Sequence, residues 1–360
     1  MICNLLISPD CIRMQFVCKS WQSILKNSSS RLRELPWLMM LPRDKDKEEE
    51  YPDARDFFSL SRQKIFTVGL PETRGKRCCG SFQNGWLMTV DIDLNSTFEH
   101  QNYVAEEGAY TIEEIRDLHI CKAALSDDAN MVVAIYGLGH SAFCRIGDKV
   151  WTEIDEAPYT VDVVHHNGQF YALSPAAGIH LFRCEDNAPR FEKLTQGLDP
   201  HGPGPSYLVP DIVSDSKFVI IRDEGYIDDT RPRMSRNFDI YKAPAPLGKG
   251  APDKELTKVE SLGDRIVFLG YNSSIIVMAG AFPGFKGNRI YFGDNCPELY
   301  FRSPRGCCDS GVFNVGDRKV QQLFADRFHP PSAPPLSINC NPAPIPSTRN
   351  DYGEEKLHFT

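Results

Sequence analysis

Side chains that could act as acids, bases or ligands occur in adjacent pairs in this sequence. His165 and His166 could bind a metal, but successive residues of a strand point to opposite faces, so the pair cannot share one ion. The pairs Asp223-Glu224 and Asp228-Asp229 could supply a general acid and base. They lie around Gly225 in a segment that we expect to be a solvated loop, so their pattern favours structure over catalysis.

Common catalytic and nucleotide-binding motifs are missing from the sequence. It contains no Gly-x4-Gly-Lys-Ser/Thr phosphate loop, no His-Glu-x-x-His and no Gly-x-Ser-x-Gly. The single Gly-x-Gly, at Gly137-Leu138-Gly139-His140, is better explained by a turn after a strand. We therefore expect a non-enzymatic protein without a cofactor or a bound metal. A hydrolase would become an alternative only if titratable side chains gathered in the centre of the fold.

The twelve cysteines are scattered along the chain, and none forms a Cys-x-x-Cys pair that would begin a zinc site. Cys78-Cys79 and Cys307-Cys308 are adjacent pairs. The first seven residues are too short and too poor in positive charge for a secretory signal. We therefore expect reduced thiols and a location in the nucleus, the cytoplasm or both.

Charge and hydropathy limit the partners that this chain is expected to bind. The formal net charge of −8 and a pI near 5.6 argue against general binding to nucleic acid or to anionic membranes. No apolar run approaches the length needed to cross a bilayer. Hydrophobic residues make up 41% of the chain, which is typical of a globular protein and leaves a protein partner as the expectation.

The N-terminal segment predicts a short amphipathic helix. Ser8 and Pro9 are typical of a helix start, and a solvated face carries Arg13, Lys19 and Lys26. The opposite face is apolar and consists of Ile12, Phe16, Val17, Trp21 and Ile24. A helix this short is unstable alone in water, so its apolar face needs a partner.

From about residue 60 the sequence consists of short apolar runs and turn dipeptides, which predicts an all-β body. Asn167-Gly168 joins two apolar runs and is a strong hairpin signal. A strand–turn–strand unit recurs four times, with starts at residues 142, 181, 240 and 312 and spacings of 39, 59 and 72 residues. The first three units are each followed by a pair of apolar strands, within 159–173, 207–222 and 265–279.

The first of these spacings matches a four-stranded propeller blade of about 40–50 residues. We therefore expect a mainly β fold, a β-propeller of about six short four-stranded blades preceded by a small α-helical segment. A pair of β-sandwiches is the alternative. The expected organisation is a helical piece at 1–35, a charged linker at 36–59, a propeller at 60–325 and a Pro-rich, extended or disordered tail at 326–360.

Two sets of residues resemble known families. Val17-Cys18-Lys19-Ser20-Trp21 resembles the end of an F-box, the motif that docks on the Skp adaptor of cullin–RING ubiquitin ligases. By this comparison the first F-box helix is not within the chain, so the F-box is N-terminally truncated. The resemblance implies that the adaptor would contact Ile12, Val17, Cys18, Lys19 and Trp21.

The β-rich body resembles the KIB-type β-propeller that follows F-boxes in a large plant family. The matching blocks occur in family order and are 80–87, 151–154, 162–172, 261–270, 282–292 and 309–313. The resemblance implies a propeller with kelch-like repeats that presents a target protein for ubiquitination and has no catalytic residues.

Together the two resemblances imply a substrate receptor of a Skp–cullin–F-box ubiquitin ligase, with a Skp adaptor, a cullin and an unknown target as partners. The alternative is a propeller without a working F-box, which acts as a stand-alone binding module or competitor. The sequence does not identify the target or the propeller face that binds it.

Overall fold

The computed structural model describes residues 35–40, 54–91, 120–198, 204–226, 233–244, 255–293, 309–323 and 336–339, apart from 75, 82–86, 138, 149, 155–156, 186–187, 212, 215 and 271–272. In this part of the chain the regular structure is strand, apart from short 3-10 turns such as η2 (Pro71–Thr73) and η4 (Ala279–Ala281). The predicted N-terminal helix lies outside the described residues.

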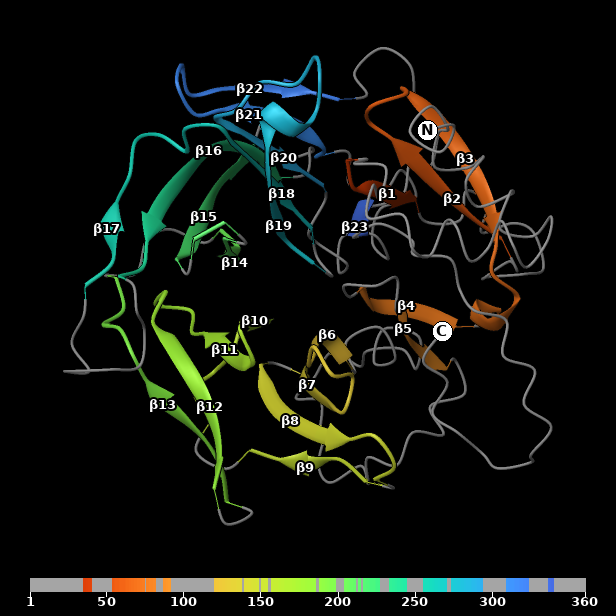
Figure 1. The fold of residues 1–360 in the computed structure, drawn as a ribbon. Helices are drawn as coiled ribbons and strands as arrows, with labels where there is room; N and C mark the ends of the chain where they lie inside the picture. Colours follow the sequence, from red (N-terminus) through yellow and green to blue (C-terminus); the bar gives the residue numbers. More distant parts are fainter. Residues whose placement is uncertain are drawn as a thin grey trace.

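The described strands form six sheets that stand in a ring, like the blades of a propeller (Figure 1). We number the sheets as blades in the order in which they follow one another round the ring. Blade 1 contains β1 (Trp37–Met40), β2 (Ala54–Ser59), β3 (Lys64–Gly69) and β23 (Leu336–Asn339). Blade 2 contains β4 (Lys76–Ser81) and β5 (Leu87–Asp91). Blade 3 contains β6 (Ile120–Leu125), β7 (Met131–Tyr136), β8 (His140–Arg145) and β9 (Thr152–Glu153).

The second half of the ring contains the two longest described strands and the largest sheet. Blade 4 contains β10 (Asp162–His166), β11 (Gln169–Leu173), β12 (Ile179–Glu185) and β13 (Ala188–Lys193). Blade 5 contains β14 (Ser206–Pro210), β15 (Lys217–Tyr226), β16 (Arg233–Lys242) and β17 (Thr257–Lys258). Blade 6 contains β18 (Arg265–Leu269), β19 (Ile275–Met278), β20 (Arg289–Phe292), β21 (Gly311–Asn314) and β22 (Lys319–Gln322). The chain is thus a β-propeller, and four of its six described sheets have the predicted four strands.

The predicted hairpin at Asn167-Gly168 is confirmed. Both residues have positive φ, 51° and 75°, as a two-residue hairpin turn that follows the twist of its strands requires. The turn joins β10 to β11 in register from His166 opposite Gln169 to Asp162 opposite Leu173. Local sequence therefore fixes the register of this blade.

The four repeated strand–turn–strand units are also confirmed, as the antiparallel pairs β8–β9, β12–β13, β16–β17 and β21–β22. Each of the first three units is the outer half of a blade, and the apolar pair that follows it begins the next blade. The spacings grow because β15 and β16 each extend over ten residues and because blade 6 contains an additional strand.

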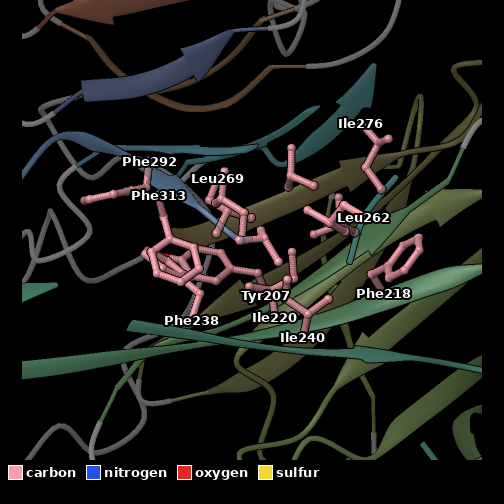
Figure 2. Packing of buried hydrophobic residues seen from close by; sticks show 14 residues of the cluster. Tyr207, Phe218, Ile220, Phe238, Ile240, Leu262, Leu269, Ile276, Phe292 and Phe313 are labelled. Atoms are coloured by element: carbon pink, nitrogen blue, oxygen red, sulfur yellow. The ribbon is translucent and has the colours of Figure 1, made fainter. Parts of the chain in front are cut away.

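The hydrophobic core lies between the blades, because strand alternation sends neighbouring residues to opposite faces of each sheet. In β15, Val219 and Ile221 pack toward blade 4, whereas Phe218 and Ile220 pack toward blade 6. Figure 2 shows the second cluster, in which the Phe238 ring lies 5.0 Å from that of Phe292 and 5.1 Å from that of Phe313. Blade 5 is thus buried on both sides.

Similar apolar clusters join blades 2 and 3, 3 and 4, and 6 and 1. The cluster between blades 6 and 1 brings Leu38 and Phe58 together with Ile266 and Phe268, so the ring is closed by packing as well as by strand pairing. Between blades 1 and 2, the buried guanidinium of Arg55 donates to the carbonyl oxygen atoms of Thr73 and Lys76, at 2.9 and 3.2 Å.

Blade 6 departs from the antiparallel pattern, because β18 pairs with β20 in parallel and β19 lies outside them at the sheet edge. The connection back to β20 passes tightly over the start of β18. A Cβ added at Gly287 would lie 2.5 Å from the Gly263 carbonyl oxygen, so only glycine fits there. In the sequence, Gly284 and Gly287 predict sharp turns between blades, but the structure places both in the connection between β19 and β20, within blade 6.

The ends of the propeller differ from the predicted boundaries. β1 and β2 lie in the segment expected to be a linker, and β23 lies in the segment expected to be a Pro-rich tail. Residues 336–339 contain no proline and pair with β1 along its whole length, from Trp37 opposite Asn339 to Met40 opposite Leu336. A short proline-free segment is therefore sufficient to supply a strand to the first blade.

Candidate interaction surface

The described residues offer no obvious catalytic centre. Within them, no group of three or more His, Cys, Asp or Glu side chains is arranged to hold a metal ion. No helix in the same residues is long and apolar enough to cross a membrane. Among the described cysteines, Cys121, Cys144 and Cys184 form no disulfide.

The prediction that Asp223 and Glu224 lie in a solvated loop is wrong. Both belong to β15, which continues beyond β14 as a two-stranded ribbon with β16 and has a register shift at these residues. The Glu224 carboxylate oxygen Oε1 lies 3.1 Å from Nε of Arg222. Loop composition misled the prediction, because Glu224 compensates a buried cation, whereas Asp223 is exposed on the ribbon. Asp228 and Asp229 lie outside the described residues.

Arg222 is the centre of the largest buried polar cluster in the described part of the chain. Its guanidinium donates to a carboxylate oxygen of Asp309, to the Ser235 hydroxyl and, at 2.9 Å, to the Gly293 carbonyl oxygen. Asp309 also accepts hydrogen bonds from the amide and hydroxyl of Ser235, at 2.7 and 2.8 Å. The Arg222 side chain is 1% exposed, so this cluster joins blades 5 and 6 and is not open to a ligand.

The ionisation of this cluster is fixed by its surroundings. Burial opposes the charge on Arg222, but Tyr207, Asp309 and Glu224 outweigh that effect and raise the pKa of the guanidinium. Burial also raises the pKa of Tyr207 to about 12, so its hydroxyl stays protonated and accepts from Arg222 at 3.3 Å. Near neutral pH Arg222 is therefore charged and Tyr207 is neutral, which suits a structural role.

A second polar contact links the adjoining strands of three successive blades. Lys122 on β6 forms an ion pair with Asp162 at the start of β10, with Nζ 2.5 Å from Oδ1. The other carboxylate oxygen of Asp162 accepts from the Leu208 amide on β14, at 2.8 Å. The Asp162 side chain is 1% exposed, and each of its carboxylate oxygens contacts a neighbouring blade. It therefore holds blades 3, 4 and 5 together.

His165 is packed against the residues around it. Its ring meets the edge of Phe170, with 4.6 Å between centroids, and its Nδ1 lies 3.2 Å from the Asp127 carboxylate. Burial lowers the pKa of His165 despite the nearby Asp127. The imidazole therefore joins the β10–β11 hairpin to the β6–β7 turn as a neutral group.

The exposed residues of interest lie at the β7–β8 turn of blade 3. Gly139 has a φ of 108°, and a Cβ added to it would lie 2.8 Å from two ring carbons of Tyr159. The Tyr159 ring therefore lies directly on the glycine backbone, while the residue remains 56% exposed. The amide of Thr160 donates to the Gly139 carbonyl oxygen at 2.9 Å and fixes the two segments together.

An exposed carboxylate borders the same turn. Glu153 on β9 accepts a hydrogen bond from the Tyr136 hydroxyl at 2.8 Å and lies 3.9 Å from His140 Nδ1. Its side chain is 60% exposed. We call the group formed by Tyr136, Gly139, His140, Glu153 and Tyr159 the Tyr159 surface. The sequence placed a turn at this Gly-x-Gly, which is confirmed, but gave no sign that an exposed tyrosine would cover it.

The residues expected to contact a Skp adaptor are Ile12, Val17, Cys18, Lys19 and Trp21, and all five lie outside the described residues. The aromatic residues Trp86, Trp151, Phe170 and Tyr171 are of a size that predicts packing between blades. Phe170 and Tyr171 are buried there, Trp151 is partly buried, and Trp86 lies outside the described residues. These placements leave the exposed loops of the propeller as the described surface on which a partner can bind.

Comparison with known proteins gives a specific family match. The KIB1-4 beta-propeller family matches residues 57–314, from within β2 to the end of β21. Two putative F-box proteins of Arabidopsis thaliana are similar over most of their length. One is 24% identical over 341 residues, 82% of this chain and 86% of the relative. The other is 27% identical over 345 residues, 90% of each protein.

Solved structures show weaker likeness. The major allergen Mala s 1 of Malassezia sympodialis is 10% identical, with a TM-score of 0.35 over 83% of this chain and 91% of that chain. The beta-propeller domain of Cps50 (Swd1) from Myceliophteria thermophila is 8% identical, with a TM-score of 0.30 over 75% and 82%. The family match is the more specific finding.

Proposed function

Because the chain belongs to the KIB1-4 beta-propeller family, we propose that it is the substrate-receptor subunit of a Skp–cullin–F-box ubiquitin ligase. In this role it acts in the nucleus, the cytoplasm or both and catalyses no reaction itself. The propeller holds a target protein, and the N-terminal segment binds a Skp adaptor that leads to a cullin. The rate of ubiquitin transfer then rises because the target is kept close to the ubiquitin-carrying enzyme.

The observation that carries this proposal is the agreement between the two ends of the chain. The propeller matches its family over residues 57–314, and relatives named as F-box proteins align over 82–90% of this chain. The segment in front of the propeller contains Val17-Cys18-Lys19-Ser20-Trp21, which resembles the end of an F-box. The propeller structure supports the same role, since its buried polar groups are committed to joining blades and its loops are exposed.

The direct test is the affinity of the purified chain for a plant Skp adaptor, measured by isothermal titration calorimetry. A version extended with a complete F-box N-terminus is measured beside it. The proposal expects sub-micromolar binding by the chain, that is, a binding free energy of about −8 kcal/mol or stronger. Binding by the extended version alone would overturn the proposal for this chain and favour a stand-alone binding module or competitor.

A matched pair of variants tests the residues. Trp21→Ala removes the largest side chain of the apolar helix face and is expected to weaken adaptor binding by tenfold or more, about 1.4 kcal/mol. Lys26→Ala, on the solvated face, is the control and is expected to change affinity less than twofold. Equal affinity of both variants would contradict the assignment of this helix face to the adaptor.

A further inference from the structure

We infer that the Tyr159 surface binds an arginine- or lysine-bearing segment of the target protein. The inference rests on the proposed function, because it names the chemistry of the target that the propeller would hold. It starts from the Gly-x-Gly turn at 137–139, whose glycines both have positive φ, 55° and 108°.

The Tyr159 side chain is held in one position although the residue is exposed. An exposed aromatic side chain normally loses rotamer freedom when a partner covers it, which weakens binding. The Tyr159 ring already lies on Gly139, at a distance that leaves no room for a Cβ, so part of this loss is incurred on folding. Tyrosines held in this way are typical of the side chains that contribute most to protein interfaces.

The exposed Glu153 carboxylate supplies the negative charge of this surface. Within the described part of the chain, no lysine or arginine forms an ion pair with Glu153, and the nearest basic group recorded is His140 at 3.9 Å. The Tyr136 hydroxyl uses one acceptor position of the carboxylate, and further positions remain for a guanidinium or an ammonium group. The chain's net charge of −8 also favours the approach of a basic segment.

The Tyr159 ring and the Glu153 carboxylate together suit one basic side chain of the target. A tyrosine ring face attracts a cation, and arginine can stack on such a ring while it pairs with a carboxylate. The Tyr159 ring lies on Gly139 and the Glu153 carboxylate lies beside His140, so the two groups border consecutive residues at the end of one turn. Val161, two residues after Tyr159, is also exposed and could contact the aliphatic part of the side chain. Other exposed apolar residues, such as Ile146, Val150 and Val213, lie in other turns and are not part of this group.

The experiment is a selection of peptides on the purified full chain from a random displayed library. Selected peptides are synthesised with a fluorophore and titrated by fluorescence anisotropy against wild-type protein, Tyr159→Ala, Glu153→Gln and the control Val213→Ala. Val213 is 58% exposed, like Tyr159, but lies in the β14–β15 turn. Each peptide is also made with its arginines replaced by citrulline, which keeps the shape and removes the charge.

The expected result is enrichment of arginine or lysine in the selected peptides and an affinity loss of about tenfold with either Tyr159→Ala or Glu153→Gln. Citrulline peptides should lose affinity similarly, and Val213→Ala should leave it within about twofold. Selection of no binders, of peptides without basic residues, or of peptides equally bound by all variants would overturn the inference. Circular dichroism confirms that the variants fold.

Skp adaptor binding is measured on the same variants. Tyr159→Ala and Glu153→Gln should leave it unchanged, because both residues are in the propeller. If the adaptor binds and the peptides contradict the expectation, only the assignment of the Tyr159 surface fails. If the adaptor does not bind wild-type protein, the proposed function fails while the peptide result still reports on the surface.

Discussion

The two faces of blade 5 bury their cations in different ways. Toward blade 4, the ammonium of Lys217 lies 4.0 Å from the centre of the Tyr171 ring, beside a cluster of aliphatic side chains. Toward blade 6, the guanidinium of Arg222 meets the Asp309 carboxylate, the Ser235 hydroxyl and two backbone carbonyl oxygens. Both residues are on β15 and are 1% exposed, so burial alone does not explain the difference.

The difference follows from the regularity of the neighbouring blades. Blade 4 is an antiparallel sheet that satisfies its own backbone groups along the ladder. Blade 6 contains a parallel pair, and the carbonyl oxygens of Gly293 and Asp309 lie where β20 has ended and β21 has not begun. Arginine has several donors in a fixed plane, so one side chain can serve both carbonyls and a carboxylate. A buried arginine thus compensates for an irregular ladder.

The largest effect is expected from Asp309→Ala, which leaves Arg222 buried without its main carboxylate partner. Removal of one member of a buried ion pair typically costs about 3–5 kcal/mol. The midpoint of urea unfolding should fall accordingly, and Glu255→Ala, at an exposed residue, should change stability by less than about 0.5 kcal/mol. A small effect of Asp309→Ala would show that Glu224 alone is sufficient for Arg222.

Replacing the pair as a whole sharpens this result. The double variant Arg222→Met with Asp309→Leu removes both charges and fills the space with apolar atoms. Buried pairs replaced in this way often cost little, so the double variant should be more stable than Asp309→Ala in the same urea titration. A double variant at least as unstable as Asp309→Ala would indicate that the backbone carbonyls need the arginine donors.

The apolar side of blade 5 is expected to respond to cavity formation. Leu208 is fully buried in the cluster with blade 4, and Leu208→Ala should cost about 3 kcal/mol because surrounding side chains collapse only in part. Leu208→Met, which nearly keeps the volume, should cost less than about 1.5 kcal/mol. Similar losses for both variants in urea unfolding would argue against tight packing at this junction.

Lys217→Met tests whether the second buried cation needs a charge. The substitution removes a cation–π contact but also removes the cost of burying an ammonium, and methionine sulfur packs well on aromatic rings. The net loss is expected to be about 1 kcal/mol, well below that of Asp309→Ala. A loss as large as that of Asp309→Ala would show that the two faces are energetically alike.

The smallest effect concerns pH and lies at the junction of blades 3 and 4. Burial lowers the pKa of His165 in the folded state, so below the unfolded value of about 6.5 the unfolded chain binds more protons and stability falls. The urea midpoint should therefore drop between about pH 7.5 and about pH 5.5, and less so in His165→Gln. His180 has a pKa lowered by burial as well and accounts for part of the remaining drop. An unchanged pH dependence in His165→Gln would contradict the role of His165.

Features encoded by neighbouring residues were predictable from the sequence. The Asn167-Gly168 turn and the four outer hairpins depend on local turn chemistry and on alternation, and the sequence located each of them. The Gly-x-Gly turn at 137–139 was found for the same reason. Local turn and alternation patterns were therefore sufficient to predict the repeated hairpins and the Gly-x-Gly turn beneath the Tyr159 surface.

Features that depend on distant partners were not predictable. Parallel pairing of β18 with β20 and pairing of β1 with β23 depend on which strand edge is available in the closed ring. Arg222 and Asp309 are 87 residues apart in the sequence, so their pairing depends on how blades 5 and 6 pack. The residues around Asp223 and Glu224 give no sequence signal for a buried cation. The position of the Tyr159 ring likewise depends on its contact with Gly139, a residue in another turn.

Closure of the ring through β1 and β23 has a consequence for synthesis of the protein. During translation β1 emerges from the ribosome early, while its partner strand is still to be made. Until residues 336–339 have been made and have emerged, the nascent chain carries an unpaired strand edge that other chains could occupy. Completion of the first blade must therefore wait for β23, and chaperone protection of that edge would matter most before this strand emerges.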